Sequence, residues 1–88
     1  MYYKNGGIDL DKDIKLYTWS YCPFCQNAKK LLDKKGYDYE EVVLDDDEVR
    51  RKEMIEETGQ ETVPMIFIDG RLIGGFDQLK AMDEQGEL

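Results

Sequence analysis

The sequence predicts an α/β fold with the element order β-α-β-α-β-β-α, and three patterns carry this prediction. Residues 14–18 alternate between apolar and polar or aromatic positions, as a short strand does. Residues 24–32 repeat apolar side chains at helical spacing. Asp69-Gly70 separates two short apolar runs and is the strongest hairpin signal in the chain. With 88 residues, the chain is expected to form one domain with a modest core.

The first thirteen residues are expected to form a weakly ordered N-terminal extension, followed by the domain over residues 14–88. Asn5-Gly6-Gly7 is a turn signal, and three Asp residues interrupt the few apolar positions of this segment. Residues 14–18 then form the first strand of the domain.

A helix is expected next, over residues 23–35. Pro23 fits its first position, where the missing N–H costs nothing, and Gly36 fits its C-terminal stop. The apolar stripe of this helix is expected to consist of Phe24, Ala28, Leu31 and Leu32.

Residues 37–44 contain a second strand, best marked by residues 42–44, which completes a β-α-β unit with a parallel pair and a right-handed crossover. The three Asp residues at 45–47 offer an N-cap for a second helix over about residues 47–57, which Gly59 ends. The apolar stripe of that helix is thin, so a solvated surface helix is expected. Its members are Val49, Met54 and Ile55.

The last third of the chain predicts a hairpin and a helix. Residues 65–68 form the third strand and residues 71–74 pair back as the fourth. Residues 77–84 form the final helix, with Leu79 and Met82 facing inward and Gly86 ending it.

Composition excludes several classes of function. The net charge is −8, from 20 acidic and 12 basic residues, which argues against binding to nucleic acid or to an anionic membrane surface. The chain has no His, which removes Cys–His nucleophiles and His metal ligands. No apolar run approaches a membrane span and the N-terminus lacks a signal-peptide pattern, so a cytoplasmic protein is expected, where disulfides are usually transient and catalytic.

Cys22 and Cys25 are the only cysteines, and they lie where the first strand gives way to the first helix. Residues i and i+3 of a helix lie about 5–6 Å apart, and a disulfide needs Cα atoms roughly 4.4–6.8 Å apart. The pair is therefore interpreted as a reversible dithiol. Cys22, at the cap, is expected to attack and Cys25, inside the first turn, to resolve. A C-x-x-C beside a β-α-β pattern is typical of a thioredoxin-like redox motif.

Two other roles for the cysteines are less consistent with the sequence. A permanent staple across four residues would restrain the unfolded chain very little. Structural zinc needs four protein ligands, and no spacing of carboxylates singles out the two that are lacking, so no metal is expected.

Two further motifs each allow two interpretations. Thr62-Val63-Pro64 is either a strand-entry proline or a backbone edge that binds an extended, peptide-like ligand. The two glycines before Phe76 and Asp77 allow close approach of an anion to a helix start, or form a turn in which Asp77 is the N-cap; both can hold at once.

Together these motifs resemble those of the dithiol glutaredoxins, over about residues 14–86. The matching segments are Tyr17-Thr18, Cys22-Pro23-Phe24-Cys25, Thr62-Val63-Pro64 and Gly74-Gly75-Phe76-Asp77. The resemblance implies a thioredoxin-like fold with a four-stranded mixed sheet in the order 2-1-3-4 and helices on both faces. It also implies a cis peptide bond between Val63 and Pro64.

The resemblance further implies glutathione as a co-substrate. Glutathione would lie across Cys22, pair with the backbone of Val63, and place its γ-glutamyl carboxylate on the N–H groups around Phe76 and Asp77. Asp77 would meet its amino group and Gln60 its glycyl end. The full set of implied glutathione-binding residues is Trp19, Phe24, Gln60, Thr62, Val63, Pro64, Gly75, Phe76 and Asp77.

The implied activity is that of a glutathione-disulfide oxidoreductase, an electron-transport enzyme with a redox-active disulfide. It would reduce protein–glutathione mixed disulfides and protein disulfides, with glutathione reductase regenerating glutathione indirectly and the enzyme itself a monomer. Two positions depart from the family pattern: Trp19 stands where many members have Lys, and Phe24 where Tyr is common. Trp19 cannot replace the Lys by charge, so Cys22 is expected to depend more on the helix N-terminus.

Three other functions are less consistent with these residues. A glutaredoxin-like electron donor would be recycled by thioredoxin reductase, but the segment from Gly74 to Asp77 favours glutathione. A non-enzymatic module could bridge an iron–sulfur cluster between two chains, and Pro23 beside Cys22 argues against it. A metal-delivery domain with C-x-x-C would leave Thr62-Val63-Pro64 unexplained.

Overall fold

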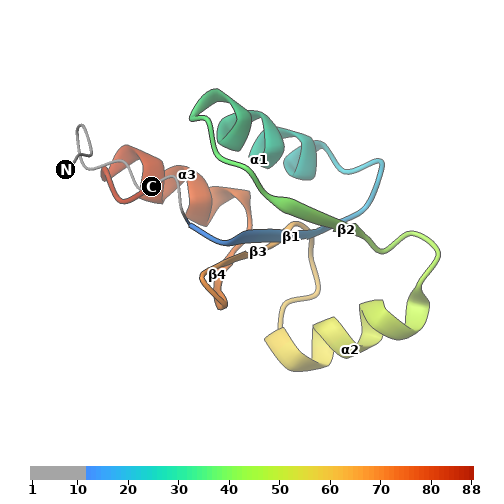
Figure 1. Ribbon diagram of the computed structural model, residues 1–88. Helices are drawn as coiled ribbons and strands as arrows, with labels where there is room; N and C mark the ends of the chain where they lie inside the picture. Colours follow the sequence, from blue (N-terminus) through green and yellow to red (C-terminus); the bar gives the residue numbers. More distant parts are fainter. Residues whose placement is uncertain (1–11) are drawn as a thin grey trace.

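A four-stranded mixed sheet in the order β2-β1-β3-β4 forms the centre of the protein (Figure 1). The structure is a computed structural model and describes residues 12–88, so the expected N-terminal extension lies almost wholly outside the described residues. The elements are β1 (Ile14–Thr18), α1 (Pro23–Lys34), β2 (Glu40–Val43), α2 (Glu48–Thr58), β3 (Met65–Ile68), β4 (Arg71–Gly74) and α3 (Phe76–Glu84). β1 runs parallel to β2 and antiparallel to β3, which is antiparallel to β4. The predicted element order, strand order and thioredoxin-like fold are confirmed.

Helices cover both faces of the sheet, with α1 and α3 on one face and α2 on the other (Figure 1). The larger core lies under α1 and α3, where Leu16 and Ile66 of the sheet pack with Ala28, Leu32 and Leu79. A smaller core under α2 is built around Tyr17, Leu44, Met54 and Met65. Within residues 12–88 no helix is long and apolar enough to cross a membrane.

The buried face of α1 differs by one position from the predicted stripe. Cys25, Ala28 and Leu32 are buried, whereas Phe24 is 58% exposed and so does not belong to the buried face of the predicted stripe. Consecutive helical residues are turned about 100° from one another, and Cys25, not Phe24, faces the sheet. Phe24 is therefore free to line a binding surface.

α2 is the solvated surface helix that was predicted. Asp47 caps it by accepting the N–H of Arg50 at 3.0 Å, and Gly59 ends it with φ +73°. Met54 is its only buried residue, and Val49 is 70% exposed, so the predicted inward position of Val49 was wrong.

The hairpin and the last helix position one wall of the site. Asp69 and Gly70 both have positive φ, +53° and +81°, as a two-residue type I′ turn requires. α3 begins at Phe76 with Gly75 as its N-cap, so Asp77 is the second helical residue and not the cap that was considered.

Candidate active site

Cys22 is the N-cap residue of α1, and two backbone groups meet its sulfur. The N–H of Cys25 donates to Cys22 Sγ at 3.3 Å, and the thiol of Cys22 donates to the carbonyl oxygen of Val63 at 3.6 Å. Pro23 at the first helical position fixes the turn that produces this arrangement. The N–H of Cys25 is thus placed where it can donate to the sulfur of an attacking cysteine. The geometry fits the attacking role predicted for Cys22.

Cys25 differs sharply from Cys22. Its side chain is fully buried, and burial, together with a hydrogen bond to Cys22, raises the pKa of the Cys25 thiol to about 12. Both cysteines are free thiols in this structure. Cys25 therefore holds its proton at neutral pH and can attack only a sulfur that is brought to it, which fits a resolving role.

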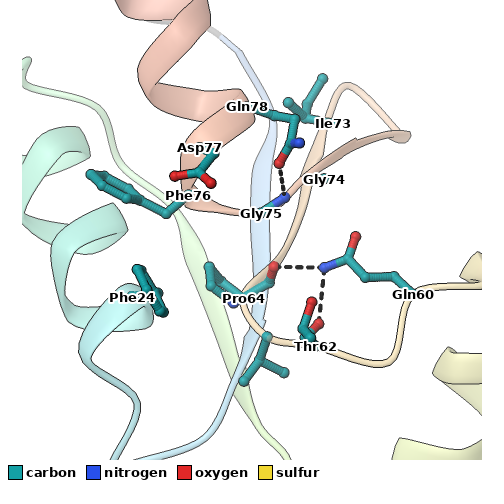
Figure 2. A pocket seen from close by; sticks show the side chains of 11 residues that line it. Phe24, Gln60, Thr62, Pro64, Ile73, Gly74, Gly75, Phe76, Asp77 and Gln78 are labelled. Atoms are coloured by element: carbon teal, nitrogen blue, oxygen red, sulfur yellow. Dashed lines mark hydrogen bonds between the residues drawn. The ribbon is translucent and has the colours of Figure 1, made fainter.

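The loop between α2 and β3 presents a backbone edge beside Cys22. The peptide bond between Val63 and Pro64 is cis, as the resemblance implied. The side-chain amide of Gln60 donates to the carbonyl oxygens of Thr62 and Pro64, both at 2.9 Å (Figure 2). Gln60 thus holds the shape of this loop, a role that sequence reasoning did not predict for it.

The start of α3 forms the facing wall. Gly74 has φ +127°, and a Cβ there would lie 2.9 Å from the side chain of Gln78. Gln78 Oε1 accepts the N–H of Gly75 at 2.8 Å (Figure 2). The N–H groups of Phe76 and Asp77 belong to the first turn of the helix and have no acceptor within it, which suits an anionic group.

These two walls enclose a groove of about 490 Å³ next to Cys22. Figure 2 places Phe24 and Gln60 at opposite ends of this groove, with Pro64 between them. The lining residues are Phe24, Gln60, Thr62, Val63, Pro64, Ile73, Gly74, Gly75, Phe76, Asp77 and Gln78. The groove therefore brings together all of the expected ligand-binding residues except Trp19.

Three lining residues were absent from the predicted set. Gly74 belonged to the motif that was noticed, and its place before the helix start was a usable signal. Gln78 is at the third helical position, where a side chain commonly reaches back to the cap. Ile73 carried no signal of its own, because its role depends on how β4 meets α3.

Trp19 lies outside the groove and contacts other parts of the site. It packs against the cluster of Cys22, Cys25 and Val63. Its ring stacks on Tyr21 with centroids 6.2 Å apart, and the Arg51 guanidinium carbon lies 4.6 Å from the ring centroid. Arg51 thus places a positive charge beside Trp19, the position where many members of the resembled family have Lys. Sequence reasoning did not predict this contact.

The loop that carries Trp19 and Tyr21 is hydrogen-bonded to the segment between β2 and α2. The carboxylate of Asp45 accepts the backbone N–H of Ser20 at 3.0 Å and also accepts the Ser20 hydroxyl. These hydrogen bonds to the Ser20 hydroxyl and N–H hold the pKa of Asp45 below its usual range.

An ion pair supports α1 from below. Lys29 Nζ lies 3.0 Å from Glu41 Oε2 on β2, and the fully buried Thr18 donates its hydroxyl to the same oxygen at 2.7 Å. Burial raises the pKa of Glu41, but the hydrogen bonds from Thr18 and Lys29 outweigh it and the net shift is downward. The hydrogen bond to Glu41 raises the pKa of Lys29.

Comparisons with known proteins agree on one family. The glutaredoxin family model matches residues 14–73. Glutaredoxin 3 of Escherichia coli is 45% identical over 76 residues, which cover 86% of this chain and 92% of the relative. A probable glutaredoxin of Synechocystis is 43% identical over 76 residues, covering 85% of this chain and 86% of the relative. The crystal structure of a buckwheat glutaredoxin–glutathione complex matches with a TM-score of 0.82 and 32% identity, over 90% of this chain and 74% of that one.

Proposed function

The chain belongs to the glutaredoxin family of thiol–disulfide oxidoreductases, and from that premise we propose that it uses glutathione to reduce protein–glutathione mixed disulfides and protein disulfides. One observation carries the proposal: Cys22 Sγ lies 3.6 Å from the carbonyl oxygen of Val63, a residue that lines the groove. A tripeptide in the groove would therefore have its own cysteine next to the nucleophile. The buckwheat relative, whose structure is a complex with glutathione, supports the choice of ligand.

The groove offers a partner for each part of glutathione. The backbone of Val63 would pair with the cysteinyl residue as a neighbouring strand does. The N–H groups of Phe76 and Asp77, in the first turn of α3, would receive the γ-glutamyl carboxylate, and the carboxylate of Asp77 would meet the amino group beside it. The loop held by Gln60 would face the glycyl end.

Reduction of a protein–glutathione mixed disulfide then needs only Cys22. Its thiolate attacks the glutathionyl sulfur, a new S–S bond forms, and the old one breaks. The protein leaves as a thiolate, which takes up a proton. A second glutathione thiolate attacks the glutathionyl sulfur on Cys22, so that oxidised glutathione leaves and the Cys22 thiolate returns.

Reduction of a protein disulfide also uses Cys25. Cys22 first forms a mixed disulfide with the substrate. Cys25 then gives up its proton and attacks Cys22 Sγ, the bond to the substrate breaks, and the substrate leaves and takes up a proton. Two glutathione molecules later reopen the Cys22–Cys25 disulfide and become oxidised glutathione. The high pKa of Cys25 delays this branch until a partner sulfur is bound.

The proposed partners are glutathionylated and disulfide-containing proteins, with glutathione reductase regenerating glutathione. The proposal places the protein in the cytoplasm as a monomer that needs neither nucleic acid nor a membrane. Its surplus of acidic residues supports the last two points.

The proposal is tested with two cysteine variants and two reductants. Cys22→Ser should abolish all thiol transfer, whereas Cys25→Ser should keep deglutathionylation and lose reduction of protein disulfides. Turnover is measured with glutathione and glutathione reductase, and separately with thioredoxin reductase. Activity with thioredoxin reductase alone would contradict the glutathione assignment. An active Cys22→Ser variant beside an inactive Cys25→Ser would reverse the two roles, and a brown, iron-containing dimer would favour a cluster-bridging module.

A further inference from the structure

A second surface adjoins Cys22 outside the groove. Trp19, Tyr21 and Arg51 form it, and we refer to these three side chains as the aromatic shelf. Trp19 stacks on Tyr21 and lies under Arg51, while its ring also contacts the cluster that contains Cys22. None of the three lines the groove. The proposed glutathione site therefore leaves this surface without a role.

Arg51 is available to a ligand. The two ion pairs formed among residues 12–88 involve Lys29 and Lys35, so the Arg51 guanidinium contacts the Trp19 ring but no carboxylate of that part of the chain. It borders a hollow of about 300 Å³ on α2, shared with Glu48, Lys52 and Ile55. An arginine held over an aromatic ring keeps its fork of N–H donors free for a carboxylate.

The charges of α2 are only partly explained by the stability of the helix: Asp47 and Glu48 at its start suit the helix dipole, whereas the residues that follow do not. Its cations, Arg50, Arg51 and Lys52, lie in the first half, and Glu56 and Glu57 lie in the last turn. For these five residues the helix dipole favours the opposite arrangement. The only consecutive run of three basic residues in the chain thus stands next to the active-site loop of a protein with net charge −8. A cluster of charges that the helix dipole disfavours and that brings no evident gain in stability points to a functional use of these residues.

The exposures of Cys22 and of its neighbour Tyr21 differ widely. The side chain of Cys22 is only 8% exposed, while Tyr21 beside it is 78% exposed. A protein disulfide that reaches Cys22 from the side of Tyr21 would bring its flanking polypeptide into contact with that ring. Exposed aromatic and arginine side chains around a small target are the residue types that dominate binding energy at protein interfaces.

We propose that the aromatic shelf binds the polypeptide that flanks the reactive cysteine of a protein substrate, with Tyr21 covering its apolar atoms and Arg51 pairing with an Asp or Glu carboxylate. This inference rests on the proposed function and adds a preference among its protein substrates. Small disulfides, which have no flanking polypeptide, do not use the shelf. Arg51 favours substrates with acidic residues near the reactive cysteine, although the protein as a whole is negatively charged. Because salt screens the attraction between Arg51 and a carboxylate, the preference weakens as the salt concentration rises.

The test compares three substrates. Two are glutathionylated peptides that differ only in Glu or Lys near the modified cysteine, and the third is the mixed disulfide of glutathione and 2-mercaptoethanol. The wild-type protein should show the higher kcat/KM with the Glu peptide. Arg51→Gln should lower kcat/KM for the Glu peptide by about twofold to fivefold, the range of one exposed ion pair. Its kcat/KM for the small disulfide should stay unchanged.

Arg50→Gln provides the matched control, because Arg50 is the adjacent cation and does not lie over Trp19. This variant should behave as the wild type with all three substrates. Arg51→Glu should invert the preference in favour of the Lys peptide. Tyr21→Ala should lower kcat/KM for both peptides, by about fivefold or more, and leave the small disulfide unaffected.

Each other outcome overturns the inference. An equal loss on all three substrates would mean that Arg51 acts on Cys22 or on glutathione. An equal loss in Arg50→Gln and Arg51→Gln would reduce the effect to general charge, and no loss in any variant would show that the shelf is unused. Failure of the wild-type protein on the small disulfide would instead contradict the proposed function, so the two failures are distinguishable.

Discussion

The groove and the aromatic shelf adjoin the same sulfur but are built from different chemical groups. The groove presents mainly backbone, namely the edge at Val63 and the first turn of α3, and two glutamines, Gln60 and Gln78, fix its shape by hydrogen bonds. The shelf presents side chains, with Tyr21 open to solvent and Arg51 without an ion pair among residues 12–88. Backbone groups suit a ligand that never changes, such as glutathione. Side chains suit partners that vary, because substitutions there alter specificity without disturbing the fold.

The largest expected effect is a difference in reactivity between the two cysteines, Cys22, whose sulfur adjoins both the groove and the aromatic shelf, and Cys25. With a pKa of about 12, on the order of one Cys25 in ten thousand or fewer is a thiolate at pH 7.5, so Cys25 should resist alkylation. Iodoacetamide should therefore add one group to the native protein, on Cys22, at any pH between 6 and 9. Mass spectrometry of the intact protein and its peptides measures this.

The unfolded protein in urea serves as the control and should take two groups. Addition of two groups to the native protein at similar rates would show that the two thiols are equivalent. Cys22 would then not be the single nucleophile of the site.

A smaller effect is expected when the groove alone is changed. Gly74→Ala places a Cβ 2.9 Å from Gln78 and pushes that side chain off the N–H of Gly75. Loss of this hydrogen bond should raise the KM for glutathione about fivefold to tenfold. Steady-state kinetics with glutathione as the varied substrate checks it, and the preference between acidic and basic peptides should not change.

Gly70→Ala separates the groove from backbone strain. Gly70 also has positive φ, +81°, but no atom lies within 4 Å of the position its Cβ would take. Both variants should lose stability, by about 1–2 kcal/mol from the left-handed backbone, whereas only Gly74→Ala should raise the KM. An equal rise in KM would mean that strain, and not the wall of the groove, is responsible.

The smallest effect is expected beneath the site, at the ion pair of Lys29 and Glu41. Because folding lowers the pKa of Glu41, its contribution is present above the unfolded value, about 4.3, and is lost as pH falls through the folded value. Because folding raises the pKa of Lys29, its contribution is lost only at strongly alkaline pH. Glu41→Gln should therefore cost about 0.5–1.5 kcal/mol at pH 7 and less at pH 3.

Urea unfolding at the two pH values measures this difference, and Glu40→Gln is the control, since Glu40 is exposed and forms no ion pair among residues 12–88. Neither the KM for glutathione nor the peptide preference should change. A change in either would mean that Glu41 on β2 contributes to the groove or to the aromatic shelf.

Local patterns were sufficient to predict the elements and most of the groove. Alternation located β1, Asp69-Gly70 located the hairpin, and Pro23 marked the helix start that makes Cys22 its cap. The phase of a helix about its axis was harder to predict, because Phe24 and Cys25 are both apolar and only packing on the sheet decides which one is buried. The prediction that Val49 belongs to the inward-facing stripe of α2 was wrong for the same reason.

Contacts between distant segments were beyond the sequence. Arg51 meets Trp19 because the fold brings α2 next to the residue that follows β1, and no local pattern encodes that approach. Gln60 carried the implied role of a ligand contact, yet its hydrogen bonds to Thr62 and Pro64 depend on a loop shape that appears only in the folded chain.

The hydrogen bonds between Ser20 and Asp45 have a thermodynamic consequence for recognition. Ser20 stands between Trp19 and Tyr21, and Asp45 stands three residues before α2, the helix that carries Arg51. The two halves of the shelf are thus joined before any partner arrives, and less conformational entropy remains to be lost when a polypeptide binds. The substitution Asp45→Ala would remove these hydrogen bonds and keep all three shelf side chains. More conformational entropy would then be lost when a polypeptide binds to them.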